Sequence, residues 1–337
     1  MTEGLRVTVS TGSRLHFGLL THRPESGREF GGLGVMIGSP GWKLTVSRMA
    51  DGSPATSDMI NVSDEANTAC PATLKRVAEI IERFRRVKHL TIPPLTVEVE
   101  SAIPSHRGLG SGTQLALAAA RAIDTCLEMG HVPVSELAQL TGRGLRSAVG
   151  IWGFESGGLI ADGGKLESEP VGSLSAAVLF PSYWLFLLIF PKTSRGLSGD
   201  DEITAFKDLP GMTQQTTQRL CEISLMKLLP AVHDHNFDLV ASALAAYGQL
   251  VGEYFAPAQG GVFADPNMLK FRDVLAEKGI KGFAQSSWGP TCAVLCSDDE
   301  MADRAVQLIR SLPEGADYEC QVSCTLNNGA DIDIVEA

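Results

Sequence analysis

The sequence is short of positive charge. Its 337 residues contain 28 lysines and arginines against 39 aspartates and glutamates, which gives a formal net charge of −11 at pH 7. Such an excess repels polyanions, so we expect no nucleic-acid partner. Any affinity for phosphate must come from a local cluster of donors.

Long hydrophobic runs are also missing. The first 20 residues, MTEGLRVTVSTGSRLHFGLL, lack the apolar core of a signal peptide. The longest apolar run, AAVLFPSYWLFLLIF at 176–190, is interrupted by Pro181 and Ser182 and is shorter than the ~20 residues that span a bilayer. We therefore predict buried strands for this run, no membrane partner and a cytoplasmic location.

Cysteine is present, but not in a pattern that binds metal or forms a disulfide framework. The seven cysteines are an odd number and include no CxxC pair. Cys292 and Cys296 share their spacing with Cys320 and Cys324, yet TCAVLC and CQVSCT have the character of strands, in which small thiols pack well. We predict neither a zinc site nor a disulfide.

Hydrophobic periodicity predicts an α+β protein of two domains. Alternating strands fill the first ~50 residues, and the patterns then predict helix 65–88, strand 95–101, helix 113–129, helix 135–149, and a hairpin at 154–166 that turns at Asp162-Gly163-Gly164. The second half predicts strand 183–190, loop 192–201, helices 213–229, 235–252 and 266–278, strands 281–286 and 291–296, helix 299–312 and strand 318–323. We place the domains at 1–170 and 171–337.

A glycine-rich loop lies between the predicted strand 95–101 and an alanine-rich helix. Gly108, Gly110 and Gly112 in PSHRGLGSGT allow the backbone to approach a phosphate group closely and to tolerate positive φ angles. The helix that follows directs its first N–H groups into the loop, and Ser111 and Thr113 add hydroxyl groups. The spacing excludes both GxxxxGK[ST] and GxGxxG.

Basic side chains accompany this loop in an otherwise acidic chain. His106 and Arg107 come directly before it, and Arg143 and Arg146 follow in TGRGLRSAVG. Charge-assisted donors of this kind suit a polyphosphate. Arg14 and His16 in SRLHFG alternate with apolar neighbours, so both are expected to face one side of a strand.

PSHRGLGSG at 104–112 resembles the phosphate-binding motif of the GHMP kinase superfamily, PxxxGLGSS. TGSRLHFGLL at 11–20 and GFAQSSWGPTCAVL at 282–295 resemble its N-terminal and C-terminal motifs. The resemblance implies a two-domain fold, with an N-terminal domain like ribosomal protein S5 domain 2, containing a left-handed β-α-β unit, and a ferredoxin-like C-terminal domain.

Within that superfamily, six segments resemble the β-ribofuranosylaminobenzene 5′-phosphate synthase family: RLHFGLL, GLGSGTQLALA, GRGLRSAVG, FESGGLIADGG, GLSGDDE and QSSWGPT. This resemblance implies a transferase of methanopterin biosynthesis and one-carbon metabolism. Its reaction would join phosphoribosyl pyrophosphate to 4-hydroxybenzoate or 4-aminobenzoate by a C–C bond and release CO₂ and pyrophosphate. We expect Mg²⁺ as cofactor, because this dication is the usual partner of a departing polyphosphate, and we expect a homodimer.

An ATP-dependent small-molecule kinase of the same fold is the main alternative. Many kinases of the superfamily carry an aspartate base in a GSGxD-like segment, where this chain has SAVGIW with Ile151 and Trp152. The missing acid favours a carbon nucleophile. A nucleotide sensor without turnover is the third possibility.

The resemblance assigns roles to four groups of residues. We expect catalytic groups at Arg14, His16, His106, Arg143 and Arg146; phosphate binding at Arg107, Gly108, Leu109, Gly110, Ser111, Gly112 and Thr113; substrate binding at Ser286, Ser287, Trp288 and Gly289; and Mg²⁺ ligands at Asp162, Asp200 and Glu202. Several alternatives stay open. His16 or His106 is the candidate base, the arginines suit either the ribose phosphate or the aromatic carboxylate, Trp288 suits stacking or packing, and the acids suit a hairpin turn or a helix cap.

Overall fold

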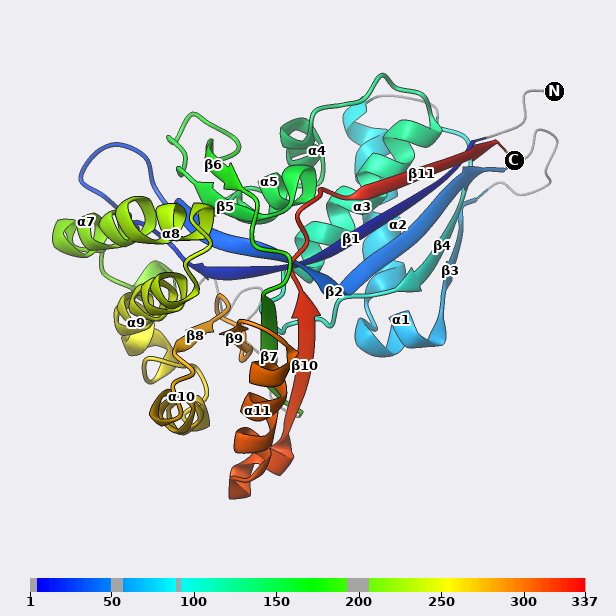
Figure 1. The fold of residues 1–337 in the computed structure, drawn as a ribbon. Helices are drawn as coiled ribbons and strands as arrows, with labels where there is room; N and C mark the ends of the chain where they lie inside the picture. Colours follow the sequence, from blue (N-terminus) through cyan, green and yellow to red (C-terminus); the bar gives the residue numbers. More distant parts are fainter. Residues whose placement is uncertain (1–4, 50–56, 89–91, 193–205, 337) are drawn as a thin grey trace.

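The protein is represented by a computed structural model that describes residues 5–49, 57–88, 92–192 and 206–336. Two sheets organise these residues (Figure 1). The larger sheet has seven strands, with β11-β1-β2-β4-β3 along its main path and with β5 and β6 attached to β2. The smaller sheet has the order β10-β7-β9-β8.

The hairpin of β1 (Leu5–Gly18) and β2 (Gly32–Arg48) is the backbone of the larger sheet. The alternating apolar residues of LRVTVS and WKLTVS face the core in both strands. The pairing shifts register between Thr11 and Ser13 and again between His16 and Gly18. These irregularities re-aim the end of β1 that carries Arg14 and His16.

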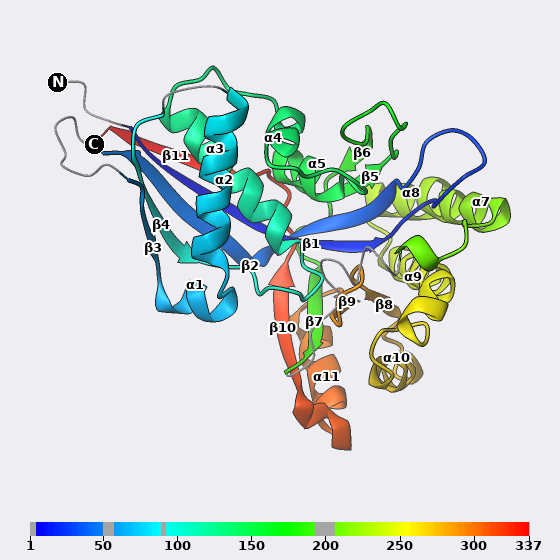
Figure 2. The same ribbon diagram turned by 180° about the vertical axis from the view of Figure 1, so that it is seen from behind.

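The remaining strands of this sheet are β3 (Met59–Val62), β4 (Leu95–Ser101), β5 (Leu159–Asp162), β6 (Leu174–Val178) and β11 (Asp331–Glu336). Five helices accompany them: α1 (Asp64–Ala69), α2 (Thr73–Lys88), α3 (Ser111–Cys126), α4 (Val134–Leu140) and α5 (Val149–Ser156). Figure 2 shows α2 and α3 lying across the sheet. Helix α3 is buried along almost its whole length because its alanines let it pack closely on β1 and β2.

The second sheet contains β7 (Leu185–Pro191), β8 (Gly282–Gln285), β9 (Cys292–Cys296) and β10 (Tyr318–Cys324). Helices α10 (Asn267–Glu277) and α11 (Asp299–Arg310) share a core with it. The other elements are α7 (Gln214–Glu222), a π-helix (Ile223–Leu228), α8 (Leu229–His233), α9 (Phe237–Gln259) and a 3₁₀ turn (Pro313–Asp317). Within the described ranges, no helix is long and apolar enough to cross a membrane.

The structure corrects several predicted elements. The single helix expected at 65–88 is divided into α1 and α2, with Pro71 in the break between them. The run 176–190, predicted to form buried strands, is buried in β7 but mostly exposed in β6.

Two further predictions differ from the structure around the turn 142–147 and β5. The expected helix 135–149 ends at Leu140, because Gly142 and Gly144 adopt φ angles of 71° and 84° and open a turn that runs to α5. The expected hairpin at 154–166 is also wrong, since residues 154–156 are helical and β5 pairs with β2 and with β6 across the connection 163–173. The predicted loop 192–201 lies almost wholly outside the described residues.

The larger sheet draws strands from both halves of the chain. Strands β6 and β11 follow residue 170, yet β6 pairs with β5 and β11 pairs with β1, so that Leu5 lies opposite Glu336. The domain division at 170 and 171 stays a prediction. What the pairing adds is that the chain returns to its first sheet after completing the second.

Candidate active site

The glycine loop forms a small cavity at the N-terminus of α3, which we call the loop cavity. It is lined by Arg76, Pro104, His106, Arg107, Gly108, Leu109, Gly110, Ser111, Gly112, Thr113 and Arg143. Gly110 precedes the helix with a φ of 77° and offers no capping side chain. The positive end of the helix and its first backbone N–H groups therefore face this cavity, as an anion site requires.

The turn 285–289 of the second sheet packs closely against this loop. A Cβ at Gly108 would lie 2.3 Å from the Ser286 carbonyl oxygen, and one at Gly289 would lie 2.4 Å from the backbone of Gly108. The Ser286 hydroxyl is fully buried, donates to the Gly108 carbonyl at 2.8 Å and accepts from the backbone N–H of His16 at 3.1 Å. Ser286, a predicted substrate ligand, thus joins the glycine loop to β1.

Arginines supply the charge of the loop cavity. Arg76 reaches it from α2 and Arg143 from the turn after α4. Burial lowers the pKa of Arg143, and the nearby charges of Arg76 and Arg83 lower it further. No carboxylate lines the cavity among the described residues, so an anion placed here would relieve this repulsion. Sequence reasoning missed Arg76, which lies in α2, 32 positions before Gly108.

Other predicted residues of the loop have partners within the protein. The Arg107 guanidinium donates to the carbonyls of Pro191 and Lys192 and lies 5.0 Å from the centroid of the Phe190 ring. The Ser111 hydroxyl donates to the Ile103 carbonyl at 2.8 Å. Arg107 and Ser111 both line the cavity, and their hydrogen bonds within the protein fix the shape of its wall.

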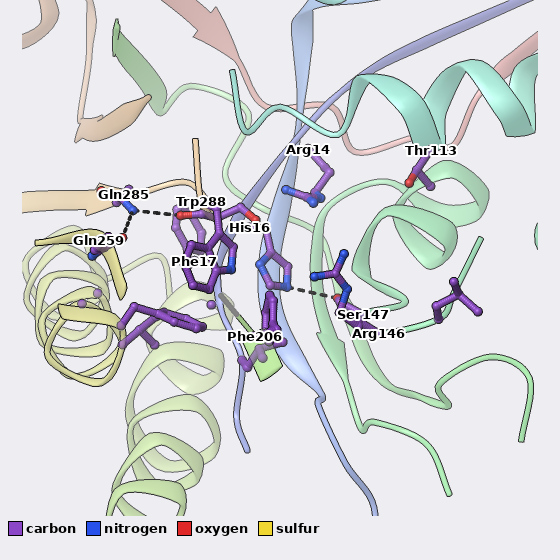
Figure 3. Close-up of a pocket in the computed structure, with 18 of the residues that line it drawn as sticks. Arg14, His16, Phe17, Thr113, Arg146, Ser147, Phe206, Gln259, Gln285 and Trp288 are labelled. Atoms are coloured by element: carbon purple, nitrogen blue, oxygen red, sulfur yellow. Dashed lines mark hydrogen bonds between the residues drawn. The ribbon is translucent and has the colours of Figure 1, made fainter. Parts of the chain in front are cut away.

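A second cavity adjoins the first, and we call it the aromatic cleft (Figure 3). It has a volume of ≈ 200 Å³ and shares Thr113 and Arg143 with the loop cavity. Its other lining residues come from β1, the turn 142–147, Phe206, α9, Val262 and the turn 285–288; they include Arg14, His16, Phe17, Leu145, Arg146, Ser147, Val251, Phe255, Gln259, Gln285, Ser287 and Trp288.

Aromatic rings form one wall of the cleft. Trp288 is 5% exposed and packs against Phe255 and Phe206, with ring centroids 4.6 Å and 5.1 Å apart. The Arg146 guanidinium lies 4.6 Å from the centroid of Phe206. The Trp288 ring is tilted by 59° to Phe255 and by 53° to Phe206, so the wall is an apolar cluster of rings bordered by a cation, which suits an aromatic acid.

Arg14 stands between the two cavities. Its side chain donates to the Gly108 carbonyl at 3.1 Å, and its backbone N–H donates to the Leu109 carbonyl at 3.1 Å. Figure 3 shows Arg14 and Arg146 on the same side of His16. No aspartate or glutamate lines the aromatic cleft within the part of the chain that the structure describes. The cleft therefore favours ligands with negative charge.

His16 lies at the centre of the cleft. Its Nε2 is 3.0 Å from the Ser147 hydroxyl, and its buried Nδ1 has no hydrogen-bond partner in the described structure. Burial lowers the pKa of His16 well below 6.5, and the charges of Arg14 and Arg146 lower it further. The imidazole is therefore neutral at physiological pH and has one unprotonated ring nitrogen, which is a weaker base than that of an ordinary histidine. His106, the other candidate base, lines only the loop cavity.

The expected metal ligands do not form a centre in the described residues. Asp162 lines neither cavity, and its carboxylate accepts from the Ala148 N–H at 2.6 Å, the Gly164 N–H at 2.9 Å and the Ser147 hydroxyl at 3.2 Å. These donors occupy both oxygens, so Asp162 does not fit a Mg²⁺ ligand. Asp200 and Glu202 lie outside the described residues, and elsewhere the structure groups no three metal-binding side chains.

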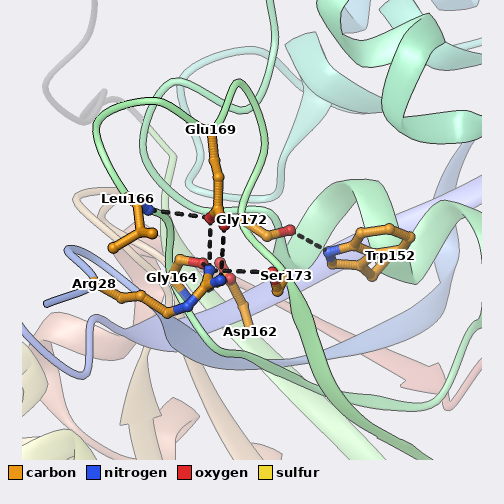
Figure 4. A network of polar contacts seen from close by, with 8 residues as sticks. All are labelled: Arg28, Trp152, Asp162, Gly164, Leu166, Glu169, Gly172 and Ser173. Carbon is orange, nitrogen blue, oxygen red and sulfur yellow. Dashed lines mark hydrogen bonds and ion pairs between the residues drawn. The ribbon is translucent and has the colours of Figure 1, made fainter.

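Asp162 instead begins a braced connection to β6 (Figure 4). The Arg28 guanidinium donates to both oxygens of Glu169, at 2.6 and 2.8 Å, and to the Gly164 carbonyl at 2.9 Å. Trp152 adds a bond from its indole N–H to the Gly172 carbonyl at 2.8 Å. The connection 163–173 is thereby held against the end of β5, where Asp162 supports Ser147.

The chain is similar to several known proteins. Residues 72–157, which include the glycine loop, match the GHMP kinases N terminal domain. The structure of mevalonate diphosphate decarboxylase from Staphylococcus aureus has the same fold, with a TM-score of 0.68, 13% identity and 99% coverage of both chains.

Two curated relatives are named β-ribofuranosylphenol 5′-phosphate synthase. The protein from Methanothermobacter thermautotrophicus is 31% identical over 88% of this chain and 90% of its own length. The one from Methanocaldococcus jannaschii is 30% identical over 68% of this chain and 73% of its own length. At this identity and coverage, the chain belongs to the β-ribofuranosylphenol 5′-phosphate synthase family, a family of transferases within the GHMP kinase superfamily.

Proposed function

We propose that the protein couples phosphoribosyl pyrophosphate to 4-hydroxybenzoate, forming a C–C bond between ribose C1 and the ring and releasing CO₂ and pyrophosphate. The observation that carries this proposal is the pair of adjoining cavities. One is a cationic cavity built on a glycine loop, the other is walled by aromatic rings, and Thr113 and Arg143 belong to both. The names of the relatives, which specify a ribosylated phenol phosphate, support the same reading.

The diphosphate would lie in the loop cavity. The N–H groups at the start of α3 and the guanidinium groups of Arg76 and Arg143 neutralise the leaving group as the bond from C1 to oxygen breaks. The ribose then lies at the boundary between the cavities. Ring carbon 1, which bears the carboxylate, faces C1 from the aromatic cleft, in line with the departing diphosphate.

Decarboxylation completes a balanced reaction. The ring carbon supplies the electron pair of the new bond to C1, and pyrophosphate leaves with the electrons of the bond that breaks. Loss of CO₂ then returns its bonding pair to the ring, which restores aromaticity. No oxidant, reductant or ATP is needed, and each turnover yields one CO₂ and one pyrophosphate.

The charges of the cleft favour the phenol over the aniline. As the ring attacks, positive charge develops at its para substituent. As the hydroxyl oxygen gains positive charge its proton becomes strongly acidic, so even a histidine of lowered pKa can accept it. The N–H group of an iminium is much less acidic, so an amine would keep its positive charge beside Arg14 and Arg146. His16 is neutral and lies between these arginines and the aromatic wall, where it can accept the hydroxyl proton.

We propose Mg²⁺ as an accompanying ion, as is usual for a departing diphosphate. The described lining of the loop cavity supplies arginines and backbone donors but no carboxylate, so these residues do not fit a metal site of their own, and the steps above do not pass through a metal. The test is the rate of synthesis with Mg²⁺ and with excess EDTA. Membership of methanopterin biosynthesis, a homodimer and a cytoplasmic location stay predictions.

Product analysis tests the proposed function. The protein is incubated with phosphoribosyl pyrophosphate and either 4-hydroxybenzoate or 4-aminobenzoate, and in a separate arm with ATP and a panel of small alcohols. We expect a product whose mass equals the sum of both substrates less CO₂ and pyrophosphate, with a higher kcat/KM for 4-hydroxybenzoate. ADP formed with an alcohol, and no C-riboside from either acid, would instead identify a kinase.

A further inference from the structure

The two ring nitrogens of His16 have unequal surroundings. Nε2 is held 3.0 Å from the Ser147 hydroxyl, while Nδ1 is buried without a partner among the described residues. The residue as a whole is only 5% exposed, yet it lines the aromatic cleft. An unpaired buried nitrogen is costly to keep in a folded protein. Because the residue lines the cleft, a ligand bound there is the candidate for the missing donor.

A count of hydrogen bonds at Ser147 decides which nitrogen carries the proton. A serine hydroxyl has one proton and two lone pairs. The Val149 N–H donates to this oxygen at 3.2 Å, which takes one lone pair. Asp162 is an acceptor when ionised, and its Oδ2 lies 3.2 Å from the same oxygen. If Ser147 donates to Asp162, its second lone pair is left for an N–H group on Nε2 of His16.

The chain of contacts is rigid. Asp162 is fully buried at the end of β5 and is fixed by the N–H groups of Ala148 and Gly164. On the other side of the imidazole, a Cβ built at Gly32 would lie 2.9 Å from His16 Nε2, so the ring packs on the bare backbone of β2. The ring is therefore held in place on both sides.

We propose that Asp162 and Ser147 are positioning residues that hold His16 as its Nε2–H tautomer and so present the Nδ1 lone pair to the hydroxyl group of the aromatic substrate. The identity of that substrate rests on the proposed function, whereas the tautomer does not. The proposal also gives Asp162 a role at the site: it acts through Ser147 rather than through a metal.

The step balances over one turnover. Nδ1 takes the phenolic proton while the ring carbon bonds to ribose C1 and pyrophosphate departs. During that interval Nε2–H continues to donate to Ser147, which donates to the Asp162 carboxylate, so the transient imidazolium faces a line of aligned dipoles. When CO₂ leaves, its electron pair regenerates the phenolate, and Nδ1 returns the proton. His16 ends as it began.

The tautomer is measured directly by ¹⁵N NMR of the imidazole nitrogens in protein labelled at histidine, without substrate. The chain has seven histidines, and the His16→Gln variant identifies the signal of His16. We expect a protonated Nε2 and an unprotonated Nδ1 in the wild-type protein, with a shift toward mixed tautomers in Ser147→Ala. A wild-type signal with the proton on Nδ1 would overturn the proposal, and so would a Ser147→Ala spectrum identical to that of wild type.

Kinetics distinguish positioning from folding. In Ser147→Ala we expect kcat to fall by about 10- to 100-fold, less than the roughly 10²–10⁴-fold that loss of a general base causes, with an unchanged KM for phosphoribosyl pyrophosphate. Ser147→Thr, which keeps the hydroxyl, is expected to restore part of the loss. Ser156→Ala is the matched control, because that hydroxyl only donates to the Trp152 carbonyl at 2.8 Å within α5.

The outcomes of the two experiments are separable. Equal kcat values for wild type and Ser147→Ala would refute the positioning role even if the enzyme makes the C-riboside. An Nε2–H tautomer that depends on Ser147, in a protein that forms no C–C bond with either benzoate, would refute the proposed function and leave the positioning intact.

Discussion

The loop cavity and the aromatic cleft adjoin each other but are built in opposite ways. Most of the loop cavity comes from the contiguous residues 104–113, and its donors are backbone N–H groups, guanidinium groups and a helix terminus. The aromatic cleft is assembled from segments scattered between β1 and the turn 285–288, and its centre is a buried neutral histidine. The loop cavity is suited to bind an anionic group, and the aromatic cleft is suited to proton transfer beside an apolar wall.

Removal of His16 is expected to slow the reaction far more than removal of His106. His16→Ala removes the only base that lines the cleft among the described residues, and we expect kcat to fall by roughly 10²–10⁴-fold. His106→Ala changes a residue of the loop cavity and is expected to alter the KM for phosphoribosyl pyrophosphate rather than kcat. Steady-state kinetics of both variants test this. If both keep wild-type turnover, neither histidine is the base.

The next effect concerns the charge of the loop cavity. Arg76→Gln removes one charge-assisted donor, worth about 1.5–3 kcal/mol, and is expected to raise the KM for phosphoribosyl pyrophosphate and the inhibition constant of pyrophosphate by roughly 10- to 150-fold. The KM for the arene should not change. Arg86→Gln, an exposed arginine on the same helix, is the control. Equal losses in both variants would show a general effect of charge rather than a contact at the cavity.

A smaller effect tests the aromatic wall. Trp288→Phe keeps a ring but removes contact area, and aromatic pairs contribute about 0.5–1.5 kcal/mol. We therefore expect the KM for 4-hydroxybenzoate to rise by roughly 2- to 10-fold, with pyrophosphate inhibition unchanged. Tyr183→Phe, at an exposed ring away from both cavities, serves as control. A change in pyrophosphate inhibition without one in arene KM would contradict the division of roles.

The smallest effect is on stability. Because burial lowers the pKa of His16 in the folded protein, the unfolded chain takes up a proton near pH 6.5 that the folded chain does not. The free energy of unfolding therefore falls as pH drops below about 6.5, by a part due to His16. Denaturant unfolding of wild type and His16→Gln between pH 5 and 8 isolates this part, because the six other histidines are shared. A constant difference across that range would show that His16 titrates alike in both states.

The two cavities also differ in how far the sequence predicts them, because one is built from contiguous residues and the other from distant segments. Strand 95–101, the glycine loop and the start of α3 follow from local signals, namely alternation, glycine spacing and an alanine-rich helix. The helix predicted at 135–149 is wrong beyond Leu140, because the positive φ angles of Gly142 and Gly144 interrupt the helical pattern. No local signal predicts β11, which pairs with the first strand from the far end of the chain.

The positions and partners of individual side chains depend on tertiary packing even more than the helices and strands do. Arg76 lies in an ordinary amphipathic helix, and only the fold brings it to the loop. Ser286 belongs to a glycine-rich motif, but its hydroxyl forms hydrogen bonds to the Gly108 carbonyl and the backbone N–H of His16. Asp162 follows a strand and precedes two glycines, which fits a turn residue, and only its contact with Ser147 connects it to the cleft.

Quantifying both released products in one reaction is the decisive test of the proposed function. 4-Hydroxybenzoate with a radiolabelled carboxyl group is mixed with phosphoribosyl pyrophosphate, Mg²⁺ and the protein, and released CO₂ and pyrophosphate are determined together. We expect equal amounts of the two, with release that requires both substrates and is slowed by roughly 10²–10⁴-fold in His16→Ala. Pyrophosphate released without CO₂, or no release from folded protein that phosphorylates a small alcohol with ATP, would contradict it.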